Sequence, residues 1–352
     1  MIAPDFLARL HVPANNGISL QLKTLTPLYT GGIGQLGDQI HPSNLLGGLR
    51  QMSCLVARTL GDAGFEDEVW GNAGGGGKKA AAKQVALRWD TSRLERKTLP
   101  VEISLPREGG RPSRWWFNTG FEGDLGLNLT RIGISDIRWQ MLLIALAIQL
   151  RHGSFGAKDQ FGLGVLAPDG DKPFCMPLDT AAAWPKAALD ESSGHLNLLR
   201  YAFGCLRFSA RPGQRPALNR STSLTLALAT RATLRNSLRA APDAPDAEKT
   251  RLTNLRHRML GKLNQFGSAV NVSAAYGTTE TPELRIAVAM KPESVEERNE
   301  VRSRFSGAAD AINSLIEKTG YRVEVPKVPF EYGAAHKADL SAWLNKLAGA
   351  TQ

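Results

Sequence analysis

Hydrophobic and polar positions follow two different periods near the beginning of the chain. Ile18, Leu20 and Leu22 stand two positions apart, which is typical of a strand with one buried face and predicts a strand over residues 17–26. Over residues 43–60 the apolar positions instead recur at helical spacing. This helix is predicted to have Ser43 as its N-cap and an apolar face made of Leu45, Leu49, Met52, Leu55, Val56 and Leu60.

Further strands and a second helix complete the first half. Short apolar segments predict strands at 84–89, at 99–105 paired with 114–120, and at 163–166. The helix predicted over 136–151 is apolar nearly all round, so we expect it between the sheet and a second surface, such as a neighbouring subunit. We interpret the order as strand, helix, strand, strand, helix, strand, which is that of a ferredoxin-like antiparallel sheet with helices on one face.

The second half repeats this plan after a proline-rich linker over residues 171–194. Its predicted strands are 198–208, 269–276, 284–290 and 321–325, and its predicted helices are 223–240, 248–263, 292–318 and 338–347. We therefore predict an α+β protein with two tandem ferredoxin-like (βαββαβ, RRM-like) domains that carry helical and loop insertions. The domains are residues 1–170, with a glycine-rich loop, and residues 195–352, with a basic helical insertion.

Composition favours a folded protein with an anionic partner. The 352 residues suffice for about two domains, and 42% hydrophobic with 22% charged residues is typical of a folded chain. The net charge of +10 favours nucleic acid first and an acidic membrane surface second. Three distant cysteines without a CxxC spacing support neither a disulfide framework nor a zinc knuckle. With no basic and apolar leader and no long apolar segment, we expect a cytoplasmic protein.

Two basic segments carry candidate chemistry. Glycines at 153, 156, 162 and 164 surround Lys158, which Phe155 and Phe161 flank, and this suits a phosphate oxygen and stacked bases. The segment lacks the Walker ending and opens no helix, so a turn that closes a sheet stays an equal interpretation. Residues 74–83 combine four glycines with three lysines, and are either a solvated insertion or a strap that orders over a nucleic-acid backbone.

The second half adds basic helices. Arg231, Arg235 and Arg239 follow a four-residue spacing, which places them on one face of the helix predicted over 223–240. The next helix carries Arg256 and Arg258 among six basic residues.

Several segments together resemble one family. They are Leu22-Lys-Thr-Leu-Thr-Pro-Leu-Tyr-Thr-Gly-Gly32, His41-Pro-Ser-Asn-Leu-Leu-Gly-Gly-Leu-Arg50, Trp70-Gly-Asn72, the glycine loop at 153–164, Arg256-His-Arg-Met-Leu-Gly-Lys262 and Gly267-Ser-Ala-Val-Asn-Val-Ser-Ala-Ala-Tyr276. The chain resembles the CRISPR-associated RAMP superfamily and, within it, the first RAMP subunit of type III-B effector complexes. The resemblance covers both halves. It departs from the family pattern at Gln51-Met52, where paired aromatics are frequent, and at Asn271, where histidine is frequent.

The resemblance implies a non-catalytic subunit near the 3′ end of the guide RNA that helps capture complementary target RNA. Its implied partners are the guide CRISPR RNA, the target RNA and other RAMP subunits, with no cofactor, no metal and no membrane. Lys158 and Arg50 are expected on phosphates, and Arg256, Arg258 and Lys262 on the second-domain side of the cleft. The full set of expected RNA-binding residues is Tyr29, Thr30, Gly31, Gly32, His41, Ser43, Asn44, Arg50, Lys158, Gln160, Arg256, Arg258 and Lys262.

Two other function classes stay open. In an endoribonuclease, His41 would be a general base with His152 as a candidate acid, or Asp38 would contribute to a metal site. In a purely structural assembly subunit, the basic surfaces would contact only acidic protein neighbours.

Overall fold

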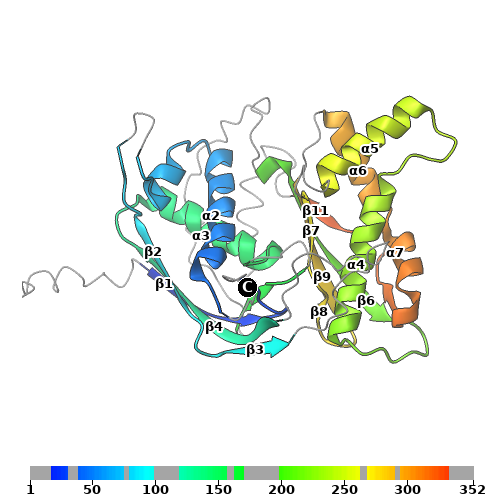
Figure 1. Cartoon of the computed structure of the whole chain (residues 1–352), viewed down its shortest axis with the longest axis horizontal. Coiled ribbons are helices and arrows are strands. Elements are labelled where there is room, and N and C mark those ends of the chain that lie inside the picture. Colours follow the sequence, from blue (N-terminus) through cyan, green and yellow to red (C-terminus); the bar gives the residue numbers. More distant parts are fainter. Residues whose placement is uncertain are drawn as a thin grey trace, which may run out of the picture.

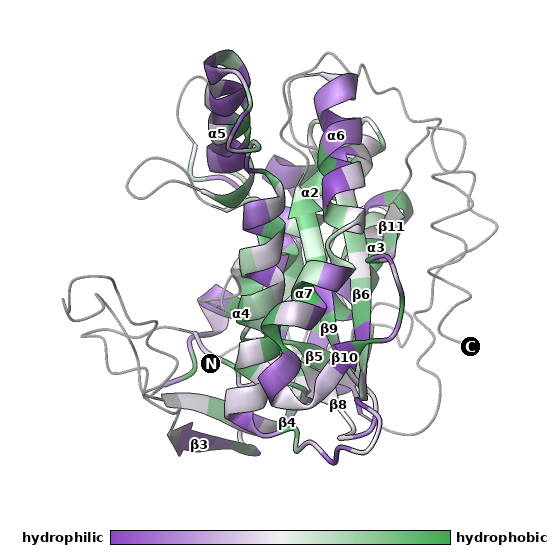
Figure 2. Ribbon diagram, turned by 90° about the vertical axis from the view of Figure 1, so that its right-hand side faces the viewer, coloured by the Kyte–Doolittle hydropathy of each residue, from purple (hydrophilic) through white to green (hydrophobic). Residues whose placement is uncertain are grey.

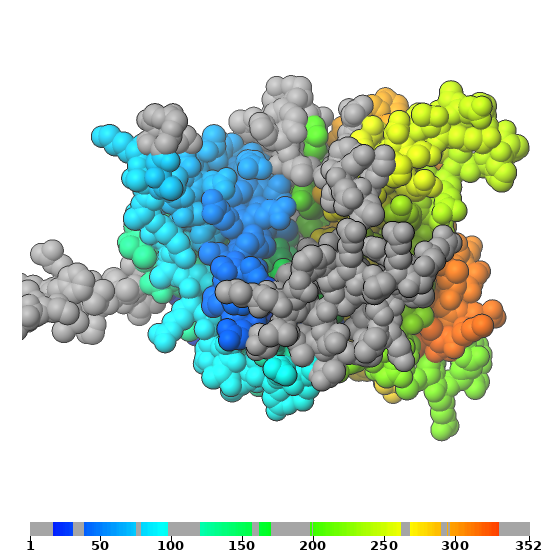
Figure 3. All heavy atoms as spheres, viewed as in Figure 1, coloured from blue at the N-terminus to red at the C-terminus, as the bar shows by residue number. Residues whose placement is uncertain are grey.

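The computed structural model describes residues 17–30, 39–74, 79–98, 119–156, 162–169, 198–261, 268–289 and 294–332. Two antiparallel sheets with helices packed on them make an α+β protein, which is compatible with two tandem ferredoxin-like domains (Figure 1). The blue-to-cyan first half and the green-to-red second half lie side by side (Figure 3). Within the described ranges, every helix is too short or too polar to cross a bilayer.

The first sheet has the strand order β2-β4-β1-β5, with β3 paired to β4. All its pairs are antiparallel. The elements of this half are β1 (Gly17–Thr24), α2 (Pro42–Thr59), a π-helical turn (Glu66–Trp70), β2 (Val85–Asp90), β3 (Leu94–Thr98), β4 (Thr119–Arg131), α3 (Asp136–His152) and β5 (Leu166–Pro168). The predicted strand at 99–105 and most of the one at 114–120 lie outside the described residues.

Strand β4 is longer than its sequence indicates. It pairs with β1 on one side and with β2 and β3 on the other, and it runs eleven residues past position 120. Its buried leucines Leu125, Leu127 and Leu129 alternate as a strand requires. The glycines at 120, 123 and 126 interrupt the apolar pattern that would have predicted it.

Helix α2 forms as its periodicity predicts, and every residue of its predicted apolar face is buried. The predicted N-cap is wrong, because His41 holds that position with extended φ and ψ of −98° and 108°. Pro42 follows as the first helical residue, and a proline disfavours helical conformation in the residue before it. Ser43 therefore lies inside the first turn rather than before it.

Helix α3 lies between the two halves of the chain. Its residues from Met141 to Leu150 are buried. On one side it packs with the first sheet, and on the other its last residue, His152, stacks on Phe203 of the second half. The second surface expected beside this all-round apolar helix is therefore supplied by the same chain (Figure 1).

The second sheet has the order β10-β6-β9-β7, with β11 paired to β6 and β8 paired to β9. Its elements are a 3-10 turn (Leu198–Arg200), β6 (Tyr201–Ala210), α4 (Arg220–Ser237), α5 (Asp246–Leu260), β7 (Val270–Val272), β8 (Tyr276–Gly277), β9 (Pro282–Ala289), α6 (Val295–Ser306), α7 (Ala309–Leu315), a second 3-10 turn (Glu317–Thr319), β10 (Tyr321–Val323) and β11 (Phe330–Tyr332). The helix predicted at 338–347 lies outside the described residues.

Two of the predicted elements of this half are divided. The strand expected at 269–276 is two short strands, β7 and β8, both paired to β9. The helix expected at 292–318 breaks after Ser306 into α6 and α7, where Gly307 is the C-cap of α6. Glycine has low helix propensity, so it favours an end to a helix over its continuation.

The two faces of the second sheet have different neighbours. Leu206 of β6 and Ile286 of β9 pack with α4, α5, α6 and α7 in the core of the second half. Phe203 and Ala287, which alternate with them along the same strands, pack instead with the core of the first half. The second sheet is therefore covered by its own helices on one face and borders the first half with the other.

Candidate nucleic-acid interface

A groove of about 410 Å³ lies between the two halves. Three parts of the chain line it: the exposed side of α2, the loop after α3, and the face of the second sheet that borders the first half. The lining side chains and main-chain groups include Ser43, Asn44, Gly47, Gly48, Gln149, His152, Gly153, Tyr201, Phe203, Asn271, Ser273 and Arg285.

The α2 wall presents main chain at Gly47, beside the side chains of Ser43 and Asn44. A Cβ atom on Gly47 would meet nothing within 4 Å, and one on Gly48 would lie 3.1 Å from Nε2 of Gln149. Gly47 thus leaves the helix surface bare toward the groove, whereas the Gln149 side chain covers the helix at Gly48. A ligand can approach the helix backbone closely there.

The loop before α2 is fixed by Thr30. Its Oγ1 donates to the Gln39 carbonyl at 3.0 Å and accepts from the His41 N–H at 3.0 Å. The side chain of Asn44 donates to the Thr30 carbonyl. Tyr29 is buried beside it, with 2% of its surface exposed. Of the residues predicted here, Ser43 and Asn44 line the groove, while Thr30 and His41 position the start of α2 and Tyr29 is not in the groove lining.

The glycine-rich loop is closed by contacts that only glycine allows. A Cβ on Gly156 would lie 2.3 Å from the Tyr29 carbonyl oxygen, and one on Gly162 would lie 2.1 Å from the Ala274 nitrogen. Both have positive φ, +88° and +84°. The Ala274 N–H donates to the Gly162 carbonyl at 2.9 Å and so ties the loop to the second half. These glycines therefore support the interpretation as a packed turn, and the turn forms one border of the groove.

Phe155 is not available for stacking on a ligand. It is fully buried and packs edge-on against Trp89, with ring centroids 5.8 Å apart. The prediction that it flanks a basic groove is wrong, because its side chain belongs to the first core.

Three aromatic rings stack along the sheet wall. The His152 and Phe203 rings lie 4.8 Å apart at 24°, and the Phe203 and Tyr201 rings lie 5.8 Å apart at 22°. All three residues line the groove, and Tyr201 is half-buried at one end of the series. An aromatic ring at the border of a groove is a platform on which a base can stack.

Arg285 joins the sheet to the glycine loop. Its Nε donates to the Tyr276 hydroxyl at 2.9 Å, and its NH1 donates to the Gly153 carbonyl at 3.2 Å. The guanidinium also lies over the Tyr276 ring, 5.4 Å from the centroid. These contacts hold a positive charge at the groove wall.

His152 is neutral at physiological pH. Burial, together with the charges of Arg151 and Arg285, lowers its pKa to about 3. A general acid must be protonated at the working pH, which His152 is not. His41 is the N-cap of α2 and is not among the residues that line the groove. Within the described ranges, no three metal-ligating side chains gather at one place.

The predicted arginines lie outside the groove. Arg50 is exposed and pairs with Glu66 at 3.0 Å. Arg256 and Arg258 lie on α5, and neither lines the groove. Gly31, Gly32, Lys158, Gln160 and Lys262, together with Asp38, lie outside the described residues.

In the basic segment at 74–83, residues 75–78 lie outside the described residues. The part that follows is anchored, because Ala81 pairs with Asn72. Lys83 lies over the Trp70 ring, 5.9 Å from its centroid, and burial lowers the pKa of its ammonium group.

Sequence reasoning missed the sheet wall. Tyr201, Phe203 and Arg285 alternate with buried aliphatic residues on strands that were themselves predicted. The spacing of two residues between Tyr201 and Phe203 was the available signal, since it places both rings on one face.

Comparisons with known proteins gave matches among solved structures. No protein-family model matches the chain, and no curated protein sequence matches it either. The structure is similar to Cmr1 from Pyrococcus furiosus in its apo form, with a TM-score of 0.40 and 12% identity over 81% of this chain and 96% of that one.

Two further similar chains come from cryo-EM structures of the type III-B Cmr-beta complex bound to cognate target RNA. One has a TM-score of 0.45 and 11% identity over 82% of this chain and 98% of that one. The other complex also holds AMPPnP, in the presence of single-stranded DNA, and matches with a TM-score of 0.45 and 11% identity over 86% of this chain and 99% of that one.

Proposed function

We propose that this chain is a non-catalytic RNA-binding subunit of a cytoplasmic type III CRISPR effector complex. It lies near the 3′ end of the guide RNA, contacts other RAMP subunits and helps capture complementary target RNA in antiviral defence. Its two tandem ferredoxin-like domains, residues 1–170 and 195–352 with the linker 171–194, hold the RNA between them. The segments that resemble the RAMP superfamily are the basis of this assignment.

The observation that carries the proposal is the make-up of the groove. One wall has bare helix backbone at Gly47, and another ends in the stacked ring of Tyr201. Single-stranded RNA is held by backbone contacts, basic groups and stacking, and the groove offers all three, with Arg285 as its basic group. The net charge of +10 supplies the long-range attraction.

The predicted contacts take more specific roles in this proposal. Ser43 and Asn44 contact RNA in the groove, while main-chain groups of Gly31 and Gly32 pack against it. Lys158 binds a phosphate, with Gln160 beside it. Arg50 exchanges its exposed carboxylate partner for a second phosphate, which costs little because exposed ion pairs are weak.

The proposal is tested with the purified chain and labelled single-stranded RNA over a range of salt concentrations. We expect log K to fall steeply with log salt for the wild type, with the RNA left intact. Lys158→Ala should lower this slope by about 0.7, the contribution of one phosphate contact in a single strand. Lys318→Ala, which removes an exposed lysine from the second 3-10 turn, is the matched control and should leave the slope unchanged.

The other two function classes have different outcomes in the same experiment. Cleaved RNA, with cleavage lost in His41→Ala or Asp38→Ala, would favour the endoribonuclease. Absence of binding at every salt concentration would favour a structural assembly subunit.

A further inference from the structure

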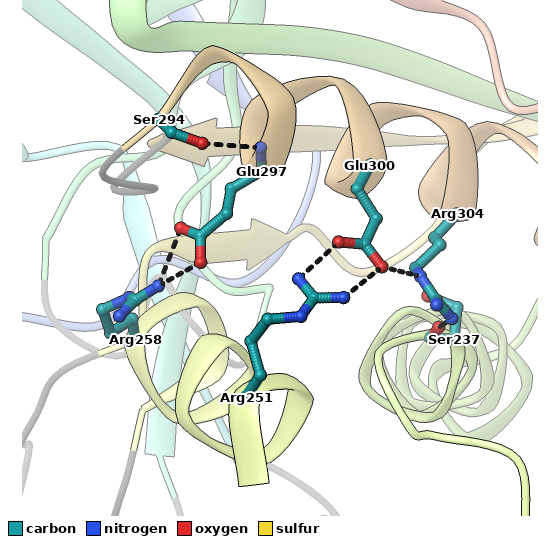
Figure 4. A network of polar contacts seen from close by, with 7 residues as sticks. All are labelled: Ser237, Arg251, Arg258, Ser294, Glu297, Glu300 and Arg304. Atoms are coloured by element: carbon teal, nitrogen blue, oxygen red, sulfur yellow. Dashed lines mark hydrogen bonds and ion pairs between the residues drawn. The ribbon is translucent and has the colours of Figure 1, made fainter. Parts of the chain in front are cut away.

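Helix α5 divides its arginines between two surroundings. Arg251 and Arg258 stand seven residues apart and therefore share one side of the helix. This side faces α6, where Arg251 pairs with Glu300 at 2.7 Å and Arg258 pairs with Glu297 at 2.8 Å (Figure 4). The two arginines that lie against α6 are thus matched by carboxylates.

The same network reaches the end of α4. Glu300 also accepts from Nε of Arg304 at 2.9 Å, and NH1 of Arg304 donates to the Ser237 carbonyl at 2.9 Å (Figure 4). The network fixes α5, α6 and the C-terminal end of α4 relative to one another.

Arg256 lies in a different environment. It is half-buried, and its Nε is buried without a hydrogen-bond partner among the described residues. Burial lowers the pKa of its guanidinium, and the positive charges of Arg235 and Arg239 lower it further. Arg235, in the last turn of α4, and Arg239, two residues past the end of that helix, are exposed. We call these three residues the arginine triad.

The triad concentrates like charges without a matching carboxylate in the part of the chain that the structure describes. The C-terminal end of α4 stabilises Arg235 and Arg239 through the helix dipole. That effect does not extend to Arg256, whose charge is partly desolvated beside two others. A bound anion would remove the repulsion and satisfy the buried Nε–H.

The triad faces away from the groove. Leu234 and Leu238, which directly precede Arg235 and Arg239, pack in the second core together with Leu255 of α5. These helices cover the face of the second sheet opposite to α2 and α3 (Figure 1). The groove lining includes no residue of α4 or α5.

We propose that the arginine triad is a second phosphate-binding site, which holds the sugar-phosphate backbone of single-stranded RNA that continues beyond the groove. The inference rests on the proposed function for the identity of the RNA. Arginine suits phosphate because its planar guanidinium carries five donors in a fork that matches phosphate oxygens.

An acidic protein would be a poorer match for this surface. Protein interfaces have an apolar centre, whereas nucleic-acid interfaces are polar and strongly positive. The large exposed hydrophobic side chains among the described residues are Ile132, Leu315 and Val325, and none belongs to α4 or α5. Figure 2 shows α5 as a mainly hydrophilic helix.

The test compares R235Q/R239Q with wild type on two lengths of single-stranded RNA. Glutamine keeps the helix propensity and most of the stem while removing the charge. R215Q/K318Q, which removes two exposed charges elsewhere in the second half, is the matched control. The short probe, about 8 nucleotides, is sized for a single binding site, and the long probe is about 30 nucleotides.

We expect R235Q/R239Q to bind the short RNA as the wild type does and the long RNA with a salt slope lower by about 1.4, or about 0.7 for each lost contact. The ratio of the affinity of the wild type for long RNA to that of R235Q/R239Q should then fall about sevenfold between 50 and 200 mM salt. Equal slopes in all three proteins would overturn the triad site and leave the proposed function standing.

A second readout does not depend on RNA binding. Inorganic pyrophosphate should raise the melting temperature of the wild type and of R215Q/K318Q more than that of R235Q/R239Q, because an anion that binds only the folded state stabilises it. An equal rise in all three proteins would overturn the site. If the wild type binds neither RNA but shows the pyrophosphate effect, the phosphate site stands and the proposed RNA function fails. Tighter binding of polyglutamate than of long RNA would assign the triad to an acidic protein and overturn its RNA occupant.

Discussion

At the scale of single residues, His152 gives the protein a defined dependence of stability on pH. Its pKa is about 3 in the folded protein, against an ordinary value of 6.5, because it is buried beside Arg151 and Arg285. Between these two values the unfolded chain binds a proton that the folded chain does not. The contribution of neutral His152 to the free energy of unfolding is therefore complete above pH 6.5 and is lost as the pH falls toward 3.

The variant His152→Phe isolates this effect because it keeps a ring against Phe203 without a titratable group. We expect the unfolding free energy of the wild type, relative to the variant, to fall by about 1.4 kcal/mol for each pH unit below 6.5, or about 2 kcal/mol at pH 5. Urea unfolding of both proteins from pH 7.5 to pH 4.5 measures the difference. Parallel pH profiles would contradict it.

At the scale of elements, a partly buried ion pair between Arg258 and Glu297 attaches α5 to α6. The side chains of Arg258 and Glu297 are 27% and 17% exposed. A double-mutant cycle with Arg258→Gln and Glu297→Gln should give a coupling of about 1 kcal/mol in urea unfolding, at the upper end for surface pairs.

The pair Lys249–Asp246 on the same helix provides the control for that cycle. Its side chains are 43% and 101% exposed, and Nζ of Lys249 lies 3.7 Å from Oδ1 of Asp246. We expect its coupling to be near zero. Equal coupling in the two cycles would mean that partial burial does not strengthen the Arg258 pair.

The sequence predicts those elements whose apolar residues keep one period. Strand β1 and helices α2 and α3 appear within a few residues of their predicted bounds, because each buries one continuous set of side chains. Strands β3 and β11 were missed. The sequence of β3 is Leu-Glu-Arg-Lys-Thr, which shows no alternation of apolar residues. The strand forms by backbone pairing with β4, and such pairing cannot be recognised from side-chain pattern.

The groove was only partly predictable for a related reason. The α2 wall and the glycine loop follow from local sequence, since Gly47 and Gly48 stand inside a predicted helix and the loop glycines cluster. The sheet wall depends on which face of β6 the helices of the second half cover. That choice is made by packing between segments far apart in the chain, and alternation alone does not decide it.

At the scale of the whole molecule, Gly162 controls how closely the two halves approach. Replacing it with alanine would place a Cβ atom 2.1 Å from the Ala274 nitrogen, so the loop and the second half must move apart. We expect faster hydrogen exchange at the Ala274 amide, which donates to Gly162, and weaker RNA binding.

The control for this variant is Gly213→Ala. Gly213 also has a positive φ, +75°, but a Cβ atom there would meet nothing within 4 Å. Gly213→Ala therefore introduces the same kind of backbone strain as Gly162→Ala, but its Cβ atom collides with no neighbouring atom. If both variants raise exchange at Ala274 equally, the effect is general destabilisation rather than separation of the halves.

The bare side of α2 has one more consequence. A molecule that lies against Gly47 meets peptide groups, which every nucleotide can approach in the same way. Base identity is read by side chains that donate to or accept from base edges, and Gly47 has no side chain to offer. Contacts at this position therefore do not depend on the base sequence of the strand. In the role proposed above, this part of the groove accepts guide RNAs of different sequences.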